Sequence, residues 1–179
     1  MGSSLILIFA VFSLFSPSYQ KNVKIEKVST CNGKQGQLTD ISGLETVEGT
    51  SGWGLTGTAE LLRNLPNNVT VSGSIYKHLI RWIPVVPVPK MSACDFLRKK
   101  LFVYEILRKN SNLPSKCPVK KSTFKFRDVK LDPTEIPWYI PSGCTRIDFK
   151  LNLGKKTIAC YRVIMNVVNG EVPKKFKCV

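Results

Sequence analysis

The sequence contains few of the residues from which metal centres are built. It has a single histidine, His78, and its six cysteines form no Cys-x-x-Cys pair. Zinc sites use such ligands in closely spaced groups, so the sequence predicts no metal site and no other cofactor. Acidic residues are also scarce: 12 aspartates and glutamates stand against 27 lysines and arginines, which gives a net charge of +15.

Catalytic motifs are scarce as well. His78 has no recognisable serine or cysteine partner motif, and Asp132 and Glu135 stand beside prolines, which is more typical of surface groups than of an acid–base pair. Residues 52–57 have the pattern G-x-G-x-x-G, but no acidic residue occurs between Glu60 and Asp95, where a dinucleotide site needs one. We therefore expect a protein without enzymatic activity.

Long hydrophobic runs are missing after the N-terminal segment. Residues 5–15 are apolar apart from Ser13, and residues 16–18 then offer small side chains at the spacing that signal peptidase uses. A run of this length is too short to span a membrane, which takes about 20 apolar residues. The sequence thus predicts a signal peptide at 1–20 and one domain at 21–179, secreted to the extracellular space or to the lysosomal lumen.

The six cysteines are an even number in a chain that we expect in an oxidising compartment. This number predicts three disulfides, although spacing alone cannot choose among the possible pairings. Asn68, Val69 and Thr70 form a sequon for N-glycosylation, which predicts a surface position for Asn68.

Alternating apolar and polar residues predict antiparallel strands. The clearest is 146–153, where Ile147 and Phe149 share one face, and a turn at 154–156 leads back into a second strand at 157–168. Further strands are predicted at 23–28, 69–76 and 124–131. A hairpin this apolar needs a second layer to cover it, so the pattern predicts an all-β fold of two layers.

Two segments do not read as interior strands. Residues 42–58 are rich in glycine, serine and threonine, which predicts a loop or a loosely paired edge. Residues 79–89 are apolar but contain three prolines, so we expect an edge strand or a loop that serves either as a lid over the core or as a lipid-contacting rim. One short helix is predicted to begin at Ser92, a good N-cap with Asp95 as its partner.

Several motifs in the C-terminal half follow one another in a recognisable order. They are Cys94-Asp95, Asn112-Leu113-Pro114, Cys117-Pro118, the aromatic strand 124–126, Ile136-Pro137-Trp138, Ser142-Gly143, Arg146-Ile147 and the turn Gly154-Lys155 that leads to Cys160. This order resembles the GM2-activator branch of the MD-2-related lipid-recognition (ML) proteins, and insect chemosensory proteins of that branch are similar in the same way. The likeness is good over 93–168 and loose over 23–89.

The resemblance implies an immunoglobulin-like two-layer β cup, with an apolar cavity for acyl chains between the sheets and rim loops that contact a membrane. It implies the disulfides Cys31–Cys160 and Cys94–Cys117, and it leaves Cys144–Cys178 as the remaining pair. Trp138 matches the aromatic residue of the rim loop. The candidate cavity residues are Trp82, Ile83, Val85, Val86, Leu97, Leu101, Phe124, Phe126, Ile136, Trp138, Tyr139, Ile140, Ile147, Phe149, Tyr161 and Val163.

The main functional hypothesis is a secreted, non-enzymatic protein that binds or transfers lipid or another hydrophobic small molecule. It can present this ligand to a receptor or to a glycosidase that acts on glycolipids, and a chemosensory role is one setting for it. The positive charge either keeps the protein soluble or attracts it to anionic membrane surfaces. The alternative is a basic secreted interaction module with a filled core, because the same apolar residues can fill an interior. No nucleic-acid partner is expected.

Overall fold

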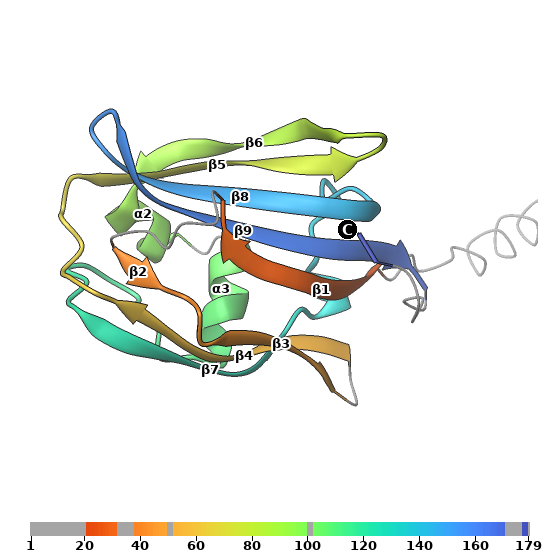
Figure 1. Ribbon diagram of the computed structural model, residues 1–179, viewed down its shortest axis with the longest axis horizontal. Coiled ribbons are helices and arrows are strands. Elements are labelled where there is room, and N and C mark those ends of the chain that lie inside the picture. The colour runs from red at the N-terminus through yellow and green to blue at the C-terminus, as the bar shows by residue number, and fades with distance from the viewer. Residues whose placement is uncertain (1–20, 32–37, 50–51, 100–101, 171–176, 179) are drawn as a thin grey trace, which may run out of the picture.

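Two antiparallel β-sheets lie face to face, and two short helices lie at one side between them (Figure 1). The computed structural model describes residues 21–31, 38–49, 52–99, 102–170 and 177–178 of the chain. The predicted signal peptide lies outside these residues. The prediction of an all-β, two-layer antiparallel sandwich is confirmed.

The larger sheet has five strands in the order β1-β9-β8-β5-β6, all antiparallel to their neighbours. The strands are β1 (Lys21–Thr30), β5 (Val69–His78), β6 (Trp82–Ser92), β8 (Gly143–Leu153) and β9 (Lys156–Asn169). The strands β8 and β9 form the predicted hairpin, and Gly154 adopts a positive φ of 60° in its turn. Strand β6 is an edge strand, where prolines are tolerated because no neighbour needs their missing N–H groups.

The second sheet is built around β4 (Gly52–Leu61). It pairs antiparallel with β2 (Thr39–Asp40), β3 (Leu44–Gly49) and β7 (Ser122–Lys130). Of the two alternatives expected for 42–58, the loop was wrong: β3 is a paired strand at an edge of this sheet, and β4 is paired on both sides. The glycines there allow close approach of two backbones: Gly57 has a φ of 107°, and a Cβ at this position would lie 2.0 Å from the carbonyl oxygen of Gly43.

The predicted helix is two helices, α2 (Ala93–Arg98) and α3 (Phe102–Lys109), and a 3₁₀ turn η2 (Pro133–Glu135) occurs later in the chain. Ser92 is the N-cap of α2: its hydroxyl accepts a hydrogen bond from the Asp95 backbone amide at 3.0 Å and donates one to the Asp95 carboxylate at 2.7 Å. The Ser92 hydroxyl and then Arg98 lower the pKa of Asp95.

Three disulfides use all six cysteines. They are Cys31–Cys160, Cys94–Cys117 and Cys144–Cys178. The first two are the pairs that the resemblance implied, and the third is the pair of cysteines that remained. The first joins the end of β1 to β9, the second joins α2 to the segment before β7, and the third joins β8 to the C-terminal residues.

Candidate functional site

The inner faces of the two sheets leave a space between them. It is a cavity of about 320 Å³, which falls within the range of about 300–1,000 Å³ that is typical of small-molecule sites. Its walls come from both sheets, both helices and the loop that joins η2 to β8. The cavity is therefore the main candidate for a functional site.

The walls are almost entirely apolar. Apart from Thr39, Glu60, Tyr104 and Tyr161, the described residues that line the cavity are aliphatic residues, phenylalanine, methionine and proline, with no lysine, arginine or histidine among them. Glu60 is an exposed residue, so among the described lining residues three polar side chains face the interior, those of Thr39, Tyr104 and Tyr161. A charged group enclosed by these walls would lose its water without gaining a partner.

Strand alternation explains how the sequence builds these walls. In β8, Ile147 and Phe149 point inward, and their register partners Val163 and Tyr161 in β9 do the same. The opposite wall comes mainly from β4 and β7, where Ala59 is the register partner of Phe124. A small alanine between larger neighbours leaves room in that wall.

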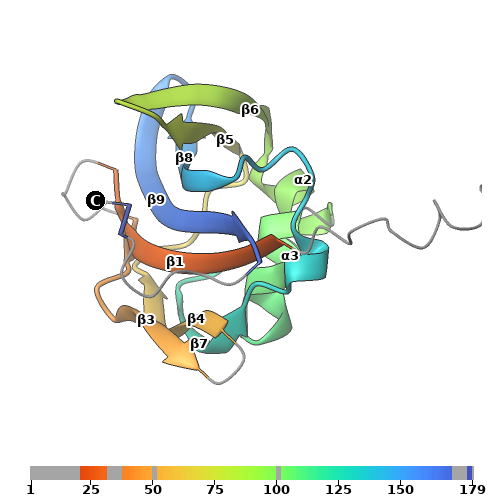
Figure 2. The same cartoon turned by 90° about the vertical axis from the view of Figure 1, so that its right-hand side faces the viewer.

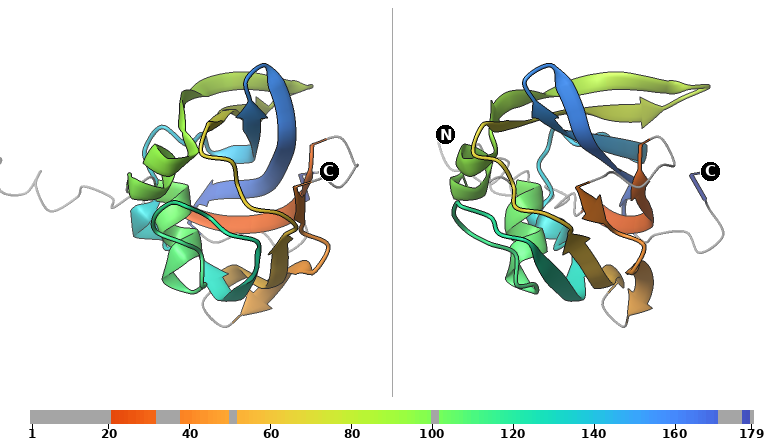
Figure 3. Two further views of the ribbon diagram at one scale, coloured as in Figure 1. Left: turned by 90° about the vertical axis from the view of Figure 1, so that its left-hand side faces the viewer. Right: turned by 60° about the vertical axis from the view of Figure 1, so that its left-hand side comes forward.

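The two helices close one side of the gap between the sheets (Figures 2 and 3). Phe96 of α2 contacts the Tyr104 ring of α3 with ring centroids 5.4 Å apart, and it contacts Phe149 of β8 at 6.3 Å. Helix α3 turns Ile106 and Leu107 toward the cavity and carries basic residues in its last turn. The helices thus complete the apolar lining instead of covering the outside of a sheet.

Two hydrogen bonds hold polar side chains within this lining. The hydroxyls of Thr39 and Tyr161 lie 2.5 Å apart and share one hydrogen bond, and the Tyr104 hydroxyl donates to the carbonyl oxygen of Pro114. Burial raises the pKa of Tyr161, an effect that the Thr39 hydrogen bond opposes, and it raises the pKa of Tyr104 to about 12. Both phenols are therefore neutral at physiological pH.

Many of the candidate cavity residues lie together along this space. Those that line it are Leu97, Phe124, Phe126, Ile136, Ile140, Ile147, Phe149, Tyr161 and Val163. Leu101 lies outside the described residues. The strands that carry most of this group were recognisable from their alternating pattern.

Six candidates do not line the cavity, and their assignment to it is corrected here. They are Trp82, Ile83, Val85, Val86, Trp138 and Tyr139. The first four lie on β6, at the edge of the larger sheet, where Ile83 and Val85 are exposed and Val86 only packs against the core cluster around Ile147. Trp138 and Tyr139 lie in the loop before β8 and are both exposed.

Several lining residues were missed by the sequence reasoning. In β3 and β4, Leu44, Leu55 and Ala59 line the cavity, but the glycines and threonines around them suggested a loop. In β1, Val23 and Ile25 also line it, and their alternation was a signal that could have identified them.

Exposed apolar side chains gather at one end of the larger sheet. At the β5–β6 turn, Ile80 is 99% exposed and Leu79 is 60% exposed, and in the loop before β8 Trp138 is 88% exposed. Lys77 near the end of β5 pairs with Thr145 near the start of β8, so the turn and the loop lie at the same end of the sheet. We call Leu79, Ile80 and Trp138 the apolar tip.

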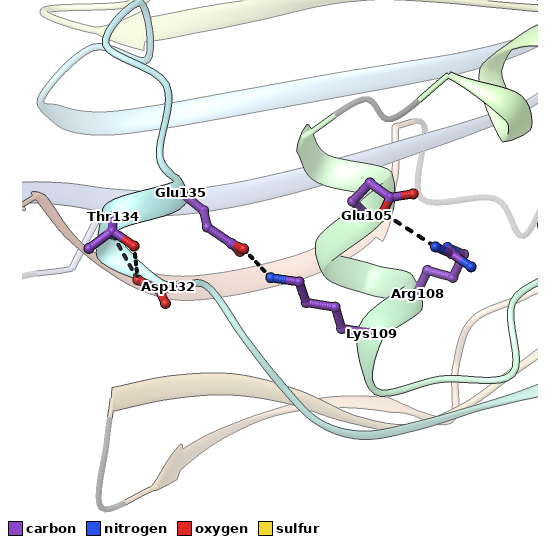
Figure 4. Close-up of polar contacts among 6 residues, drawn as sticks. All are labelled: Glu105, Arg108, Lys109, Asp132, Thr134 and Glu135. Carbon is purple, nitrogen blue, oxygen red and sulfur yellow. Dashed lines mark hydrogen bonds and ion pairs between the residues drawn. The ribbon is translucent and has the colours of Figure 1, made fainter.

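An ion pair connects two of the segments that line the cavity. Lys109 in the last turn of α3 points toward Glu135 of η2 and pairs with it (Figure 4). Beside it, the Thr134 hydroxyl and backbone amide donate to the Asp132 carboxylate, and these two hydrogen bonds lower the pKa of Asp132. The pair fastens the end of the helix to the loop that carries Ile136 and Ile140.

The outer face of the larger sheet carries a compact charged cluster. Asp148 is only 5% exposed and accepts two hydrogen bonds from the Arg162 guanidinium, at 2.8 and 2.9 Å, while the Nε atom of Arg146 lies 3.4 Å away. The Arg146 guanidinium lies 3.9 Å from the ring centroid of Tyr76 and 5.2 Å from that of Trp82. Trp82, which lies outside the cavity, also contacts the His78 ring, with centroids 4.8 Å apart.

A second hollow lies on the surface near the end of α3. It is a basic, open site that is lined by Lys109, Asn110, Ser111, Asn112, Lys125 and Arg127. Lys125 and Arg127 are exposed and alternate along β7 with Phe124 and Phe126, which face the cavity. One strand therefore contributes both to the basic surface and to the apolar lining.

Neither a metal site nor a membrane-spanning helix occurs in the part of the chain that the structure describes. Within those residues, no three or more histidine, cysteine, aspartate or glutamate side chains group as metal ligands would. No helix formed by them has the length and the apolar character needed to cross a bilayer.

Comparison with known proteins gives a family match for the middle of the chain. Residues 71–147 match the family model described as "Protein of unknown function (DUF1091)", which covers less than half of the sequence. This stretch begins in β5 and ends in β8, and it includes both helices, β7 and η2. No curated protein matches the chain significantly. The chain is thus similar to the DUF1091 family over the segment that supplies much of the cavity wall.

Proposed function

We propose that this protein is a non-enzymatic carrier that holds an acyl chain or another hydrophobic small molecule between its two sheets. The single observation that supports this most is the apolar cavity of about 320 Å³. Burial of hydrocarbon contributes about 0.8 kcal/mol per methylene, so a chain can be held in such a space without a charged anchor. The walls contain hydrocarbon side chains where an enzyme of this size would need convergent acid, base or nucleophilic groups.

The apolar tip supports a transfer function. A carrier has to approach a membrane or a partner to load and release its ligand, and exposed apolar groups commonly mark such contacts. Leu79, Ile80 and Trp138 provide them at one end of the sheet. The net charge of +15 adds attraction to an anionic lipid surface, at about 1 kcal/mol per basic residue close to it and less at high salt.

The site of action follows from the covalent structure. Three disulfides are typical of proteins from oxidising compartments, and we propose secretion to the extracellular space or to the lysosomal lumen. Asn68 is exposed in the turn before β5, so it is accessible to N-glycosylation. It precedes β5, and the apolar tip lies beyond the other end of that ten-residue strand, so a glycan there would not obstruct contact of the tip with a membrane.

The likeness to the GM2-activator branch of the lipid-recognition proteins belongs to the same proposal. The matched stretch 71–147 overlaps the region that carries most of the motifs of that likeness. On this basis we propose presentation of the ligand to a receptor or to a glycosidase. A chemosensory role is one form that such presentation can take.

A second candidate function is a basic interaction module that acts on acidic surfaces. The hollow lined by Lys109, Lys125 and Arg127 favours it, because Lys125 and Arg127 are exposed there, while Lys109 is paired with Glu135. This function predicts salt-sensitive adhesion that does not depend on ligand loading. The cavity favours the carrier, because a module of this kind has no need for an interior space.

Displacement of an environment-sensitive fluorescent fatty probe tests the carrier directly. The disulfide-bonded protein is titrated with the probe and then with alkanes, alcohols, esters, fatty acids and phospholipids. We expect probe uptake and displacement by chain-bearing ligands at both low and high salt. If no probe enters, or if the signal disappears at high salt, the acidic-surface module replaces the carrier.

A further inference from the structure

The Thr39 and Tyr161 hydroxyls form a pair within an otherwise apolar lining. Thr39 belongs to the short strand β2 of one sheet, and Tyr161 belongs to β9 of the other, so their hydrogen bond at 2.5 Å joins the two layers inside the cavity wall. Tyr161 is held in place by its backbone pairing with Phe149 of β8 and with Thr30 of β1. The polar pair is thus fixed by backbone elements on both sides.

A count of hydrogen-bonding groups shows what this pair still offers. Each hydroxyl has one donor hydrogen and two acceptor lone pairs, and the bond between them uses one donor and one acceptor. Within the described residues, neither hydroxyl makes another hydrogen bond with the protein. One donor hydrogen and several lone pairs therefore stay available at the cavity wall.

Tyr104 provides the contrast. It lines the same cavity, but its hydroxyl already donates its one hydrogen to the carbonyl oxygen of Pro114. Tyr104 cannot donate to a ligand without losing that bond. Of the two tyrosines in the lining, only Tyr161 belongs to a group with a free donor.

Charge excludes one broad class of ligand from the interior. No lysine, arginine or histidine is among the described residues that line the cavity, so an enclosed carboxylate or phosphate would have no counter-charge. A phenol is neutral at physiological pH, and burial raises the pKa of Tyr161 above its ordinary value of 10.0, so the pair remains a donor. The interior therefore suits a neutral oxygen and not an ionised one.

We propose that Thr39 and Tyr161 form a polar subsite that binds one neutral oxygen of a long-chain ligand, which is the hydroxyl oxygen of an alcohol or the carbonyl oxygen of an aldehyde, ketone or ester. This inference rests on the proposed carrier function and names the class of ligand that the carrier selects. The hydrocarbon chain occupies the apolar space, and the oxygen accepts the free hydroxyl hydrogen of the pair. A ligand with a carboxylate has to leave that group at the mouth of the cavity or bind weakly.

The test compares dodecane, dodecanol, methyl dodecanoate and dodecanoate as competitors of a fluorescent probe. The variants are Tyr161→Phe, Thr39→Val and the double variant with both changes, and Tyr104→Phe is the matched control because its hydroxyl is already engaged. We expect the double variant to lose about 3- to 10-fold in affinity for dodecanol and the ester, the effect of one neutral hydrogen bond. Each single variant should lose less, because the remaining hydroxyl of the pair then has a free hydrogen to donate. Dodecane affinity should stay unchanged in every variant, and dodecanoate should bind the wild type more weakly than dodecanol does.

Each other result has a distinct meaning. Equal losses for dodecane and dodecanol would assign the pair a purely structural role and overturn the subsite. The same loss in Tyr104→Phe, or no loss in the double variant, would overturn it as well. Failure of every competitor and of the probe to bind the wild type would instead overturn the carrier function itself. Thermal unfolding of each variant identifies any that fails to fold.

Discussion

Filling the cavity from one wall tests whether it is the space that a ligand occupies. Ala59 on β4 is a buried residue of the lining, and its register partner is Phe124. The substitution Ala59→Phe adds six carbon atoms that enter the cavity, because the alternation of β4 points this position inward. The perturbation removes room for hydrocarbon without introducing a charge.

The expected magnitude follows from the displaced hydrocarbon. Burial of hydrocarbon contributes about 0.8 kcal/mol per methylene, so a ligand that fills the space and loses the room of six carbons binds more weakly by up to about 5 kcal/mol. This upper limit corresponds to a loss in affinity of roughly a few thousandfold. A ligand that shifts or shortens loses less. We therefore expect the preferred chain length to fall by about six carbons, while the free energy of unfolding changes by less than the roughly 1–3 kcal/mol that overpacking costs.

The assay is probe displacement with a series of alcohols of increasing chain length. The matched control is Thr58→Phe, which adds a ring to an exposed position on the same strand and should leave the series unchanged. An Ala59→Phe protein that folds and binds long chains as tightly as the wild type would refute the assignment of the cavity as the ligand site. Loss of several kcal/mol of stability would show that this space is already filled.

Three further changes test the framework that holds the cavity. Replacing Cys144 and Cys178 by serine opens a loop of 34 residues, and we expect a loss of about 3.8 kcal/mol in chemical denaturation from the loop-closure entropy. Asp148→Asn leaves two arginines without their carboxylate on the outer face of the sheet, and we expect a loss of about 3 kcal/mol in urea unfolding, near the lower bound for buried pairs because the arginines are partly exposed. The pKa of Asp95 in the folded protein lies below its ordinary value of 3.8. The ionised carboxylate therefore stabilises the folded state fully above pH 3.8, and this stabilisation is lost as the pH falls through the folded-state pKa. Asp95→Asn should therefore destabilise the protein at neutral pH and match the wild type in strong acid, as measured by thermal unfolding across pH.

Controls for these three changes come from the same chain. Glu48→Gln removes an exposed carboxylate from β3 and should change the free energy of urea unfolding by no more than about 0.5 kcal/mol. Equal stability of the cysteine variant and the wild type would contradict the loop-closure argument. A stability difference for Asp95→Asn that persists unchanged below pH 3.8 would contradict the sign derived from its pKa.

The strands with regular alternation were predictable from the sequence. Residues 146–153 and 157–168 read as a hairpin, and they form β8 and β9 in the centre of the larger sheet. Their inward residues, such as Ile147 and Val163, line the cavity as expected. This worked because each strand buries one face, so the period of two is visible in the residue types.

Most of the second sheet was not predicted from the sequence, and the reason is physical. Gly57 stands in β4 because the backbone of Gly43 comes close to it, but glycine in a sequence is more often a sign of a loop. The break between α2 and α3 also left no signal, since the helical spacing continues across it. The cavity itself could not be derived, because the same inward residues suit a filled core and a hollow one.

The charged cluster on the outer face was not predictable either. Arg146, Asp148 and Arg162 read as the solvated face of two strands, yet Asp148 is almost fully buried. Their contact depends on register: Asp148 pairs with Arg162 across the hairpin, and Arg146 pairs with Tyr76 across the neighbouring strand. Trp82 contacts this cluster through the Arg146 guanidinium.

Native mass spectrometry of the protein from a eukaryotic secretory host tests the central claim most directly. If a hydrophobic ligand occupies the space between the sheets, the folded protein should carry bound lipid or take it up from a lipid panel. The added mass should disappear on unfolding and be reduced in Ala59→Phe. A spectrum of the ligand-free protein alone, with no uptake from the panel, would contradict the account.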